Sequence, residues 1–303
     1  MKSNLYKSFK GIANARNSLS TVNMDDVLIE VDDNTRHKLQ ENILLMYKDL
    51  KEVCDKYSIT PYLVGGSAIG SIRHKGFIPW DDDLDVAMSR TDYDKFVSIF
   101  EKEFGDRYIL NAPNYSKNAK TRFAKVFKRG TVFREIFERD GAEPTGLFLD
   151  IFIIENVPKN RLVRFFKGTR CNILQFISSQ VYIYENDNEV SREVLSRAGT
   201  YKLKMLIGKI FSWRSSSKWF DIVDNASRYK HTGKCGIVTG RHHYFGEIFD
   251  EKVFFPARYE QFCDIKAPVF NELETYLTYL HGNYMELPPV EKRERHFVKE
   301  LDF

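Results

Sequence analysis

Residues 62–88 read YLVGGSAIGSIRHKGFIPWDDDLDVAM, and two carboxylates in this stretch, Asp83 and Asp85, stand two positions apart in an apolar segment. Because side chains alternate across a strand, both carboxylates are expected on one face. Two carboxylates so close together repel each other unless a cation lies between them. A hard divalent ion such as Mg²⁺ prefers oxygen ligands of this kind, usually completed by substrate phosphates. The spacing therefore predicts a metal-binding strand at residues 83–88.

A glycine turn precedes these carboxylates. The apolar strand expected at 62–64 ends in Gly65, Gly66 and Ser67, and residues 67–73 are expected to form a short helix. Glycines let backbone N–H groups approach a phosphate closely, and the N-terminus of a helix favours an anion. The turn and the carboxylates together predict metal-dependent chemistry on a phosphate.

The chain of 303 residues is long enough for one large domain or two. It contains 43% hydrophobic and 29% charged residues, which is typical of a folded globular protein. No apolar run approaches the roughly 18 residues of a membrane span. Residues 1–17 also lack the apolar centre of a signal peptide. We therefore expect a cytoplasmic protein, with the inner face of the membrane as an alternative location.

Apolar periodicity and turn residues predict further elements. An apolar strand at 146–154 contains one acid, Asp150, and its burial is costly unless it is paired or binds a metal. A core carboxylate satisfied by hydrogen bonds is the alternative. The other expected elements are helices at 36–57, 91–105 and 268–281, and two strands around a turn within 122–135.

The net charge of +4 is unevenly distributed along the chain. Residues 159–234 hold 15 Lys or Arg and 6 Asp or Glu, a net of +9, which leaves −5 for the remainder. This basic segment, expected to be helical, is a candidate surface for phospholipid, a polyanionic glycan or nucleic acid. Within it, residues 201–220 interleave basic and apolar side chains. That pattern fits a helix lying on an anionic membrane, or a domain helix with a basic edge.

The four cysteines are widely spaced and form no CxxC pair. Reduced structural thiols are expected, because the cytosol keeps thiols reduced. A zinc site built from Cys235, His242 or His243, and Cys263 is the alternative, although its spacing matches no usual zinc pattern.

These motifs resemble the LicD family, a branch of the nucleotidyltransferase superfamily that includes DNA polymerase β-like enzymes. The superfamily pattern is a Gly-Gly-Ser turn, an acid-x-acid strand and a later strand with a third acid, found here at 65–67, 83–85 and Asp150. The LicD pattern is longer. It is matched by residues 66–86 (GSAIGSIRHKGFIPWDDDLDV), by 146–152 (GLFLDIF), and by 282–289 (GNYMELPP) followed by Arg293 and His296.

The resemblance implies an α+β fold. Its centre would be a nucleotidyltransferase (DNA polymerase β-like) mixed sheet core flanked by helices, with an additional helical and basic region. We expect four segments: an N-terminal arm at 1–35, a catalytic core at 36–158, the basic helical region at 159–234, and a C-terminal portion at 235–303 that completes the catalytic domain.

The resemblance also implies roles for the site residues. Asp83, Asp85 and Asp150 are the expected catalytic residues and the ligands of Mg²⁺, with Mn²⁺ as the alternative ion. One of them, for which Asp150 is the candidate, would accept the proton of the attacking hydroxyl. The Gly-Gly-Ser turn at 65–67 would contact phosphate through its amides and hydroxyl.

Further residues expected to bind substrate are Arg73, His74, Lys75, Trp80, Arg293 and His296. The basic triplet would grip a diphosphate, or form only a solvated turn. Trp80 would hold a quaternary ammonium by cation–π attraction, or serve as a structural tryptophan. The two tail residues either close over the site or cap a helix.

Members of this family are similar in moving a phospho-alcohol, most often phosphocholine from CDP-choline, onto a sugar hydroxyl of a surface glycan. For this chain the resemblance implies Mg²⁺-dependent transfer to a glycan such as teichoic acid, capsule or lipopolysaccharide, with release of CMP. The expected partners are a CDP-linked alcohol donor and a glycan acceptor, free or lipid-linked. Peripheral contact with an anionic membrane is also expected, and a nucleic-acid partner is not.

Several alternatives stay open. CDP-linked ribitol, glycerol or ethanolamine would serve in place of CDP-choline. A nucleotidyltransferase that adds NMP to a small molecule, protein or RNA would share the core, although the RHKGFIPWDDD block at 73–83 argues against it. A catalytically inactive glycan- or membrane-binding protein is disfavoured because all three acids are retained.

Overall fold

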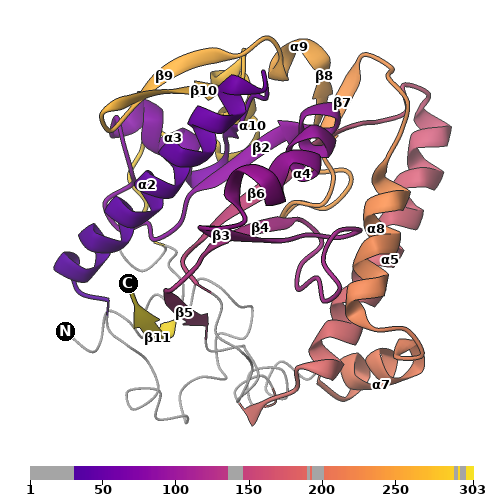
Figure 1. Ribbon diagram of the computed structural model, residues 1–303. Helices are drawn as coiled ribbons and strands as arrows, with labels where there is room; N and C mark the ends of the chain where they lie inside the picture. Colours follow the sequence, from indigo (N-terminus) through magenta and orange to yellow (C-terminus); the bar gives the residue numbers. More distant parts are fainter. Residues whose placement is uncertain (1–30, 136–145, 190–191, 193–200, 290–292, 294–297) are drawn as a thin grey trace.

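The computed structural model describes residues 31–135, 146–189, 192, 201–289, 293 and 298–303. These residues form a curled mixed sheet with helices packed around it, so the expected α+β class is confirmed (Figure 1). Of the N-terminal arm expected at 1–35, residues 1–30 lie outside the described part of the chain. None of the described helices is both long enough and apolar enough to cross a membrane.

The core helices form because apolar residues recur at helical spacing and bury one face. In α2 this face includes Leu39, Ile43 and Leu50. The Asp32 side chain caps the helix by accepting a hydrogen bond from the backbone N of Thr35 at 2.7 Å. The described helices are α2 (Asp33–Lys56), α3 (Gly65–Arg73), α4 (Arg90–Phe104), α5 (Arg161–Glu185), α7 (Tyr201–Phe211), α8 (Ser216–Ser227), α9 (Glu251–Phe254) and α10 (Leu273–His281).

The main sheet has the strand order β1-β2-β6-β4-β3, with β7 and β8 attached beyond β6. β2 and β6 run parallel, whereas β4 and β7 both pair antiparallel with β6. β6 is therefore hydrogen-bonded on both edges. The described strands are β1 (Tyr62–Leu63), β2 (Asp85–Ser89), β3 (Tyr108–Asn111), β4 (Ala124–Lys128), β5 (Val132–Glu135), β6 (Phe148–Asn156), β7 (Lys234–Ile237), β8 (Ile248–Asp250), β9 (Arg258–Phe262), β10 (Ile265–Val269) and β11 (Val298–Asp302).

Three sequence-based expectations need correction. The strand expected at 83–88 begins only at Asp85, so Asp83 lies in the preceding loop. Residues 122–135 do form two strands, but β4 joins the main sheet while β5 pairs with β11. The helix expected at 268–281 begins at Leu273, because β10 forms a hairpin with β9 just before it.

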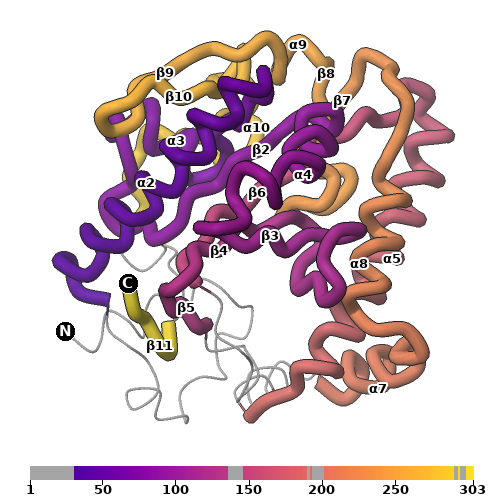
Figure 2. The backbone as a smooth tube through the Cα atoms, in the orientation of Figure 1, coloured from indigo at the N-terminus to yellow at the C-terminus, as the bar shows by residue number. Residues whose placement is uncertain are grey.

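Helices pack along one edge of the molecule and on one face of the sheet. α2 and α4 lie on one face of it, while α5 and α8 run side by side along one edge of the molecule, with α7 at their lower end (Figures 1 and 2). Buried side chains of β2, β6 and α4, such as Val86, Ile151 and Phe96, belong to one continuous hydrophobic core. The sheet and its helices therefore form a rigid platform for the strand ends.

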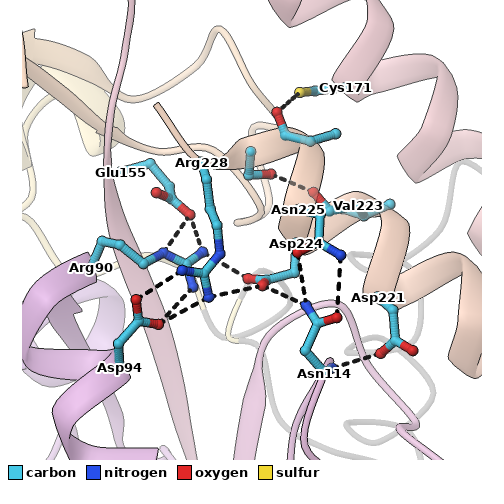
Figure 3. A network of polar contacts seen from close by, with 12 residues as sticks. Arg90, Asp94, Asn114, Glu155, Cys171, Asp221, Val223, Asp224, Asn225 and Arg228 are labelled. Carbon is cyan, nitrogen blue, oxygen red and sulfur yellow. Dashed lines mark hydrogen bonds and ion pairs between the residues drawn. The ribbon is translucent and has the colours of Figure 1, made fainter. Parts of the chain in front are cut away.

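A buried ion network joins α8 to this platform (Figure 3). Arg90, at the start of α4, pairs with Glu155 of β6 and lies 2.7 Å from Asp224 of α8. Arg228 pairs with Asp94 at 2.8 Å and extends the network to the surface. Burial lowers the pKa of Arg90, but the nearby carboxylates outweigh it, so the pKa is raised and the charge is secure.

Candidate active site

A cavity of about 960 Å³ opens at the N-terminal ends of β2 and α3. Its walls come from segments far apart in the chain, which meet because the main sheet brings β2, β6 and β7 together. They are the start of α3, the loop 80–83, Asp85, Phe152, the segment 240–242, the end of α10, and residues 283–289 with Arg293.

The carboxylates predicted from the sequence fall into two groups. Asp85 and Asp150 are cross-strand neighbours in the parallel pair of β2 and β6. Asp83 instead joins Asp81 and Asp82, and oxygens of these three carboxylates lie within 4.8 Å of one another. Among the described residues, the predicted triad of Asp83, Asp85 and Asp150 does not form a group with oxygens within 4.8 Å of one another.

Hydrogen bonds from α2 hold the acidic loop, which contains Asp81, Asp82 and Asp83. Gln40, buried in that helix, donates through its side-chain amide to the backbone oxygen of Asp81 at 2.8 Å and to that of Ile78 at 3.3 Å. These bonds fix the backbone that presents Asp81, Asp82 and Asp83 at the cavity. Gln40 reads as an ordinary helix residue in the sequence, so no local signal reveals this role.

Lys125 of β4 forms an ion pair with Asp150. The Lys125 Nζ lies 2.9 Å from Asp150 Oδ1 and 3.6 Å from the centroid of the Phe148 ring. Burial lowers the pKa of Lys125, but the charges of Asp150, Glu135 and Asp85 outweigh it and raise the pKa. A charged lysine therefore compensates the paired carboxylates. The sequence signal was a single lysine within the apolar run FAKVF.

The two glycines are needed because carboxylates pack against the start of α3. Gly65 has φ +54°, and a Cβ atom there would lie 3.3 Å from an Asp85 oxygen. A Cβ on Gly66 would lie 2.7 Å from an Asp81 oxygen, closer than such atoms can approach. Glycine at both positions thus lets the backbone of the helix N-terminus border the acidic loop.

Ser67 has a different placement from that of the glycines. It is buried and is not among the residues that line the cavity. Its Oγ accepts a hydrogen bond from the backbone N of Asp85 at 2.9 Å. This bond ties the start of α3 to the start of β2 and so positions the Asp85 carboxylate.

The residues of the basic triplet, Arg73, His74 and Lys75, do not all lie at the cavity. Arg73 lines the cavity, and its Nη1 donates to the backbone oxygen of Tyr284 at 2.6 Å. Burial, followed by the charge of Arg73, lowers the pKa of His74. Lys75 lies outside the cavity lining, and its Nζ is 3.8 Å from Glu260 of β9. The structure thus brings Arg73, but not Lys75, to the cavity.

Trp80 and Arg293 meet at the mouth of the cavity. The Arg293 guanidinium carbon lies 4.0 Å from the centroid of the Trp80 ring, and that of Arg73 lies 5.9 Å from it. The ring of His74 contacts Trp80 edge-on at 6.3 Å. His296, the other residue expected from the tail, lies outside the described residues.

Glu247 was not predicted from the sequence. It lines the cavity, is 5% exposed, and its Oε2 accepts a hydrogen bond from the Tyr276 hydroxyl at 2.8 Å. Burial raises the pKa of Glu247 to about 7, against the opposing effect of the Tyr276 bond. Glu135 also lines the cavity without having been predicted as a site residue, and His242, expected only as a ligand of the alternative zinc site, lies there too. Their local sequences carry no motif.

The zinc alternative finds no support in the described residues. In the described part of the chain, the His, Cys, Asp or Glu side chains close enough together to hold a metal ion are those of Asp81, Asp82 and Asp83. Cys235 is buried in β7, and Cys263 lies in the turn between β9 and β10.

Comparison with known proteins shows what the chain is similar to. Residues 58–165 match the family model of the LicD/FKTN/FKRP nucleotidyltransferase domain. The lipopolysaccharide cholinephosphotransferase LicD of Haemophilus influenzae is 29% identical over 255 residues, which cover 82% of this chain and 90% of that protein. An uncharacterized protein of Rickettsia typhi is 33% identical over 82 residues, 25% of this chain and 26% of its own.

The cavity with its acidic strand end and these similarities together define a phosphotransferase enzyme. Residues 58–165 thus resemble the LicD/FKTN/FKRP nucleotidyltransferase domain, and the chain is similar to LicD over most of its length.

Proposed function

We propose that the protein transfers phosphocholine from CDP-choline to a sugar hydroxyl of a lipopolysaccharide-type glycan, with release of CMP. The similarity to LicD over 90% of that protein's length carries this proposal. Teichoic acid and capsule are alternative acceptors, and the acceptor is lipid-linked in the version we favour. CDP-linked ethanolamine, ribitol and glycerol are the alternative donors.

The proposed metal is Mg²⁺, with Mn²⁺ as the alternative. The donor set fits such an ion, because the loop before β2 offers hard carboxylate oxygens of Asp81, Asp82 and Asp83 within 4.8 Å of one another. Asp83 and Asp85 would hold the ion at the cavity, with Asp150 beside Asp85. When bound, the ion neutralises the charge of the donor diphosphate.

The chain's own residues would align the reactants. Amides at the start of α3, from Gly65 and Gly66, border the cavity and would face a phosphate oxygen. Arg73 and Arg293 would compensate the remaining charge of the diphosphate. The acceptor oxygen then attacks the phosphorus that bears choline, the bond from that phosphorus to the CMP oxygen breaks, and CMP leaves.

Asp150 is the proposed acceptor of the hydroxyl proton. Asp150 is not itself among the residues that line the cavity, but Phe152, two residues along the same face of β6, lines it, and this strand position supports the role. Trp80 is the proposed contact for the quaternary ammonium of choline. Its place at the cavity wall supports the role.

We also propose the domain organisation. A polymerase β-like core at 36–158 would be completed by residues 235–303, which supply β7 beside β6 and β11 beside β5. The basic region at 159–234 would be an addition to this core, attached through α8.

A donor screen tests the function. CDP-choline and the three alternative donors are incubated with the protein and a lipopolysaccharide acceptor, with and without Mg²⁺, and CMP and labelled glycan are measured. We expect CMP and modified glycan from CDP-choline in the presence of Mg²⁺. Pyrophosphate release from NTPs, without CMP release from any CDP-alcohol, would instead identify a nucleotidyltransferase.

A further inference from the structure

The outer side of α5 is apolar, which is the reverse of an ordinary surface helix. Leu162 and Phe166 are each 70% exposed and Ile173 is 54% exposed. Spacings of four and seven residues place these side chains on one stripe of the helix. The opposite side, which faces the protein, is small and polar and includes Gly168 and Ser178.

The neighbouring helix α7 repeats this arrangement. Leu203, Leu206 and Ile210 are more than half exposed and recur at spacings of three and four residues. Gly208, on the other side of α7, is buried against α5, and a Cβ there would lie 2.5 Å from the backbone oxygen of Gln180. Both helices thus bury small residues and leave large apolar side chains outside.

Exposed cations flank both stripes. Arg161 and Arg170 lie to the two sides of the α5 stripe by helical spacing, and Lys202 and Lys209 lie along one side of the α7 stripe. Each of these four residues is exposed.

We propose that the outer face of α5 and α7, called here the α5–α7 face, docks on the surface of an anionic lipid bilayer. Apolar side chains bordered by lysine and arginine match the acyl boundary and the negative headgroups of such a surface. Neither helix crosses it, since none of the described helices could span a membrane.

Charge argues against a second copy of the chain as the occupant. The segment 159–234 carries a net charge of +9, so two such faces would repel each other on contact. Nucleic acid would satisfy the cations but would leave the exposed Leu and Phe side chains in water. An anionic bilayer satisfies both.

The inner side of α5 connects this face to the cavity. Gln175 donates from its side-chain amide to the backbone oxygen of Val238 at 2.9 Å, and its Oε1 lies 3.2 Å from His243 Nδ1. The segment between these two contacts contains Gly240, Arg241 and His242, which line the cavity. The cavity wall thus rests on a helix about 10 Å thick whose other side would touch lipid. If the proposed function holds, this geometry favours a lipid-linked glycan acceptor.

Vesicle sedimentation of the full-length protein tests the proposal. Vesicles of phosphatidylcholine are compared with vesicles that also contain phosphatidylglycerol, at low and high salt. We expect binding to the anionic vesicles that weakens with salt. The double variant Leu162→Ser/Phe166→Ser should weaken this binding at least about tenfold. The double variant Arg170→Glu/Lys209→Glu should weaken it roughly tenfold or more.

The matched control is Leu45→Ser on α2, whose side chain is 57% exposed on a helix without flanking apolar stripes. It should bind vesicles like the unmodified protein. Circular dichroism and release of CMP from CDP-choline without vesicles should be unchanged in every variant. A variant that fails to fold is replaced by Phe166→Ser alone.

Absence of binding to anionic vesicles by the unmodified protein would overturn the proposal. A dimer of the unmodified protein, detected by sedimentation velocity, would also overturn it if the Leu162→Ser/Phe166→Ser substitutions convert the dimer to a monomer and anionic vesicles do not. Vesicle binding and CMP release are separate measurements. Loss of one without the other therefore distinguishes failure of this inference from failure of the proposed function.

Discussion

The guanidinium carbon of Arg293 lies 4.0 Å from the centroid of the Trp80 ring, so the chain's tail contributes a cation to an aromatic side chain beside the acidic loop. A ring that attracts one cation through one face is able to attract another at its opposite face. The contact also holds the tail over the cavity, where Arg73 fastens it further through the backbone oxygen of Tyr284.

Replacement of this ring tests the choline contact. Trp80→Leu should raise the KM for CDP-choline about 3- to 30-fold, which corresponds to a cation–π contribution of about 0.6–2 kcal/mol. The neutral donor CDP-glycerol is the matched control, since it has no quaternary ammonium, and its binding should change less. Equal losses for both donors in a calorimetric titration would assign Trp80 a structural role.

Removal of one carboxylate charge tests the proposed catalytic strand. Asp85→Asn should lower kcat/KM about 100-fold or more, because the proposed Mg²⁺, which would neutralise the diphosphate, would lose a ligand. The matched control is Asp55→Asn at the exposed end of α2, which should retain activity. Thermal unfolding separates the effects, since neither variant should lose more than about 1 kcal/mol of stability. Full activity of Asp85→Asn in Mg²⁺ would remove Asp85 from the mechanism.

Lys125 offers a test of metal binding that does not depend on activity. Lys125→Met should lower the free energy of unfolding by about 3–5 kcal/mol, since Asp150 and Asp85 would then face each other without their cation. Mg²⁺ should restore part of this loss by binding the folded state. Lys128→Met on the same strand is the control, because Lys128 contacts the amide oxygen of Asn42 rather than a carboxylate. The idea fails if Mg²⁺ raises the melting temperature of the two variants equally.

The buried network in Figure 3 predicts a large effect on stability. Arg90→Ala should cost about 3–5 kcal/mol in the free energy of unfolding, because Glu155 would be left buried without its partner. Burial raises the pKa of Glu155 while Arg90 opposes this rise, so loss of Arg90 makes ionisation of Glu155 still more costly. Arg107→Ala, which breaks an exposed pair with Asp49, should cost no more than about 1 kcal/mol in the same urea titration.

Glu247 predicts how stability depends on pH. Burial raises its pKa from an ordinary value of 4.5 to about 7, so the folded state favours the neutral carboxyl. The resulting stabilisation is fully present below pH 4.5 and is lost as pH rises to about 7. Glu247→Gln should therefore gain roughly 3 kcal/mol relative to the unmodified protein across this window. Urea titrations at several pH values measure this difference, and a difference that stays constant with pH would contradict it.

The sequence was most informative where chemistry is encoded in adjacent residues. Gly65 and Gly66 reach the cavity as expected, and so do Asp83 and Asp85. The strand boundary was placed two residues early, because the hydrogen bond from Asp85 N to Ser67 Oγ begins the regular pairing there. That bond joins two motifs that are distant in sequence. The alternation of apolar and polar residues within one segment therefore cannot predict it.

Residues that meet only through the fold could not be predicted. Lys125 reaches Asp150 because β4 and β6 are paired in a register that places them opposite each other. Glu247 reaches the cavity from a loop after β7, and its partner Tyr276 reads as part of the apolar face of a helix. For such residues the local pattern indicates burial and leaves the partner unspecified.

The central strand β6 carries Asp150 near its start and Glu155 five residues later, on opposite faces of the sheet. Insertion or deletion of one residue between them would turn one carboxylate away from its partners, and both edges of the strand are hydrogen-bonded. The spacing of these two acids is therefore fixed by the pairing of β6. The connection at 157–160, which leads into α5, is free of that constraint, so related chains can alter their outer helices while leaving the reaction centre in register.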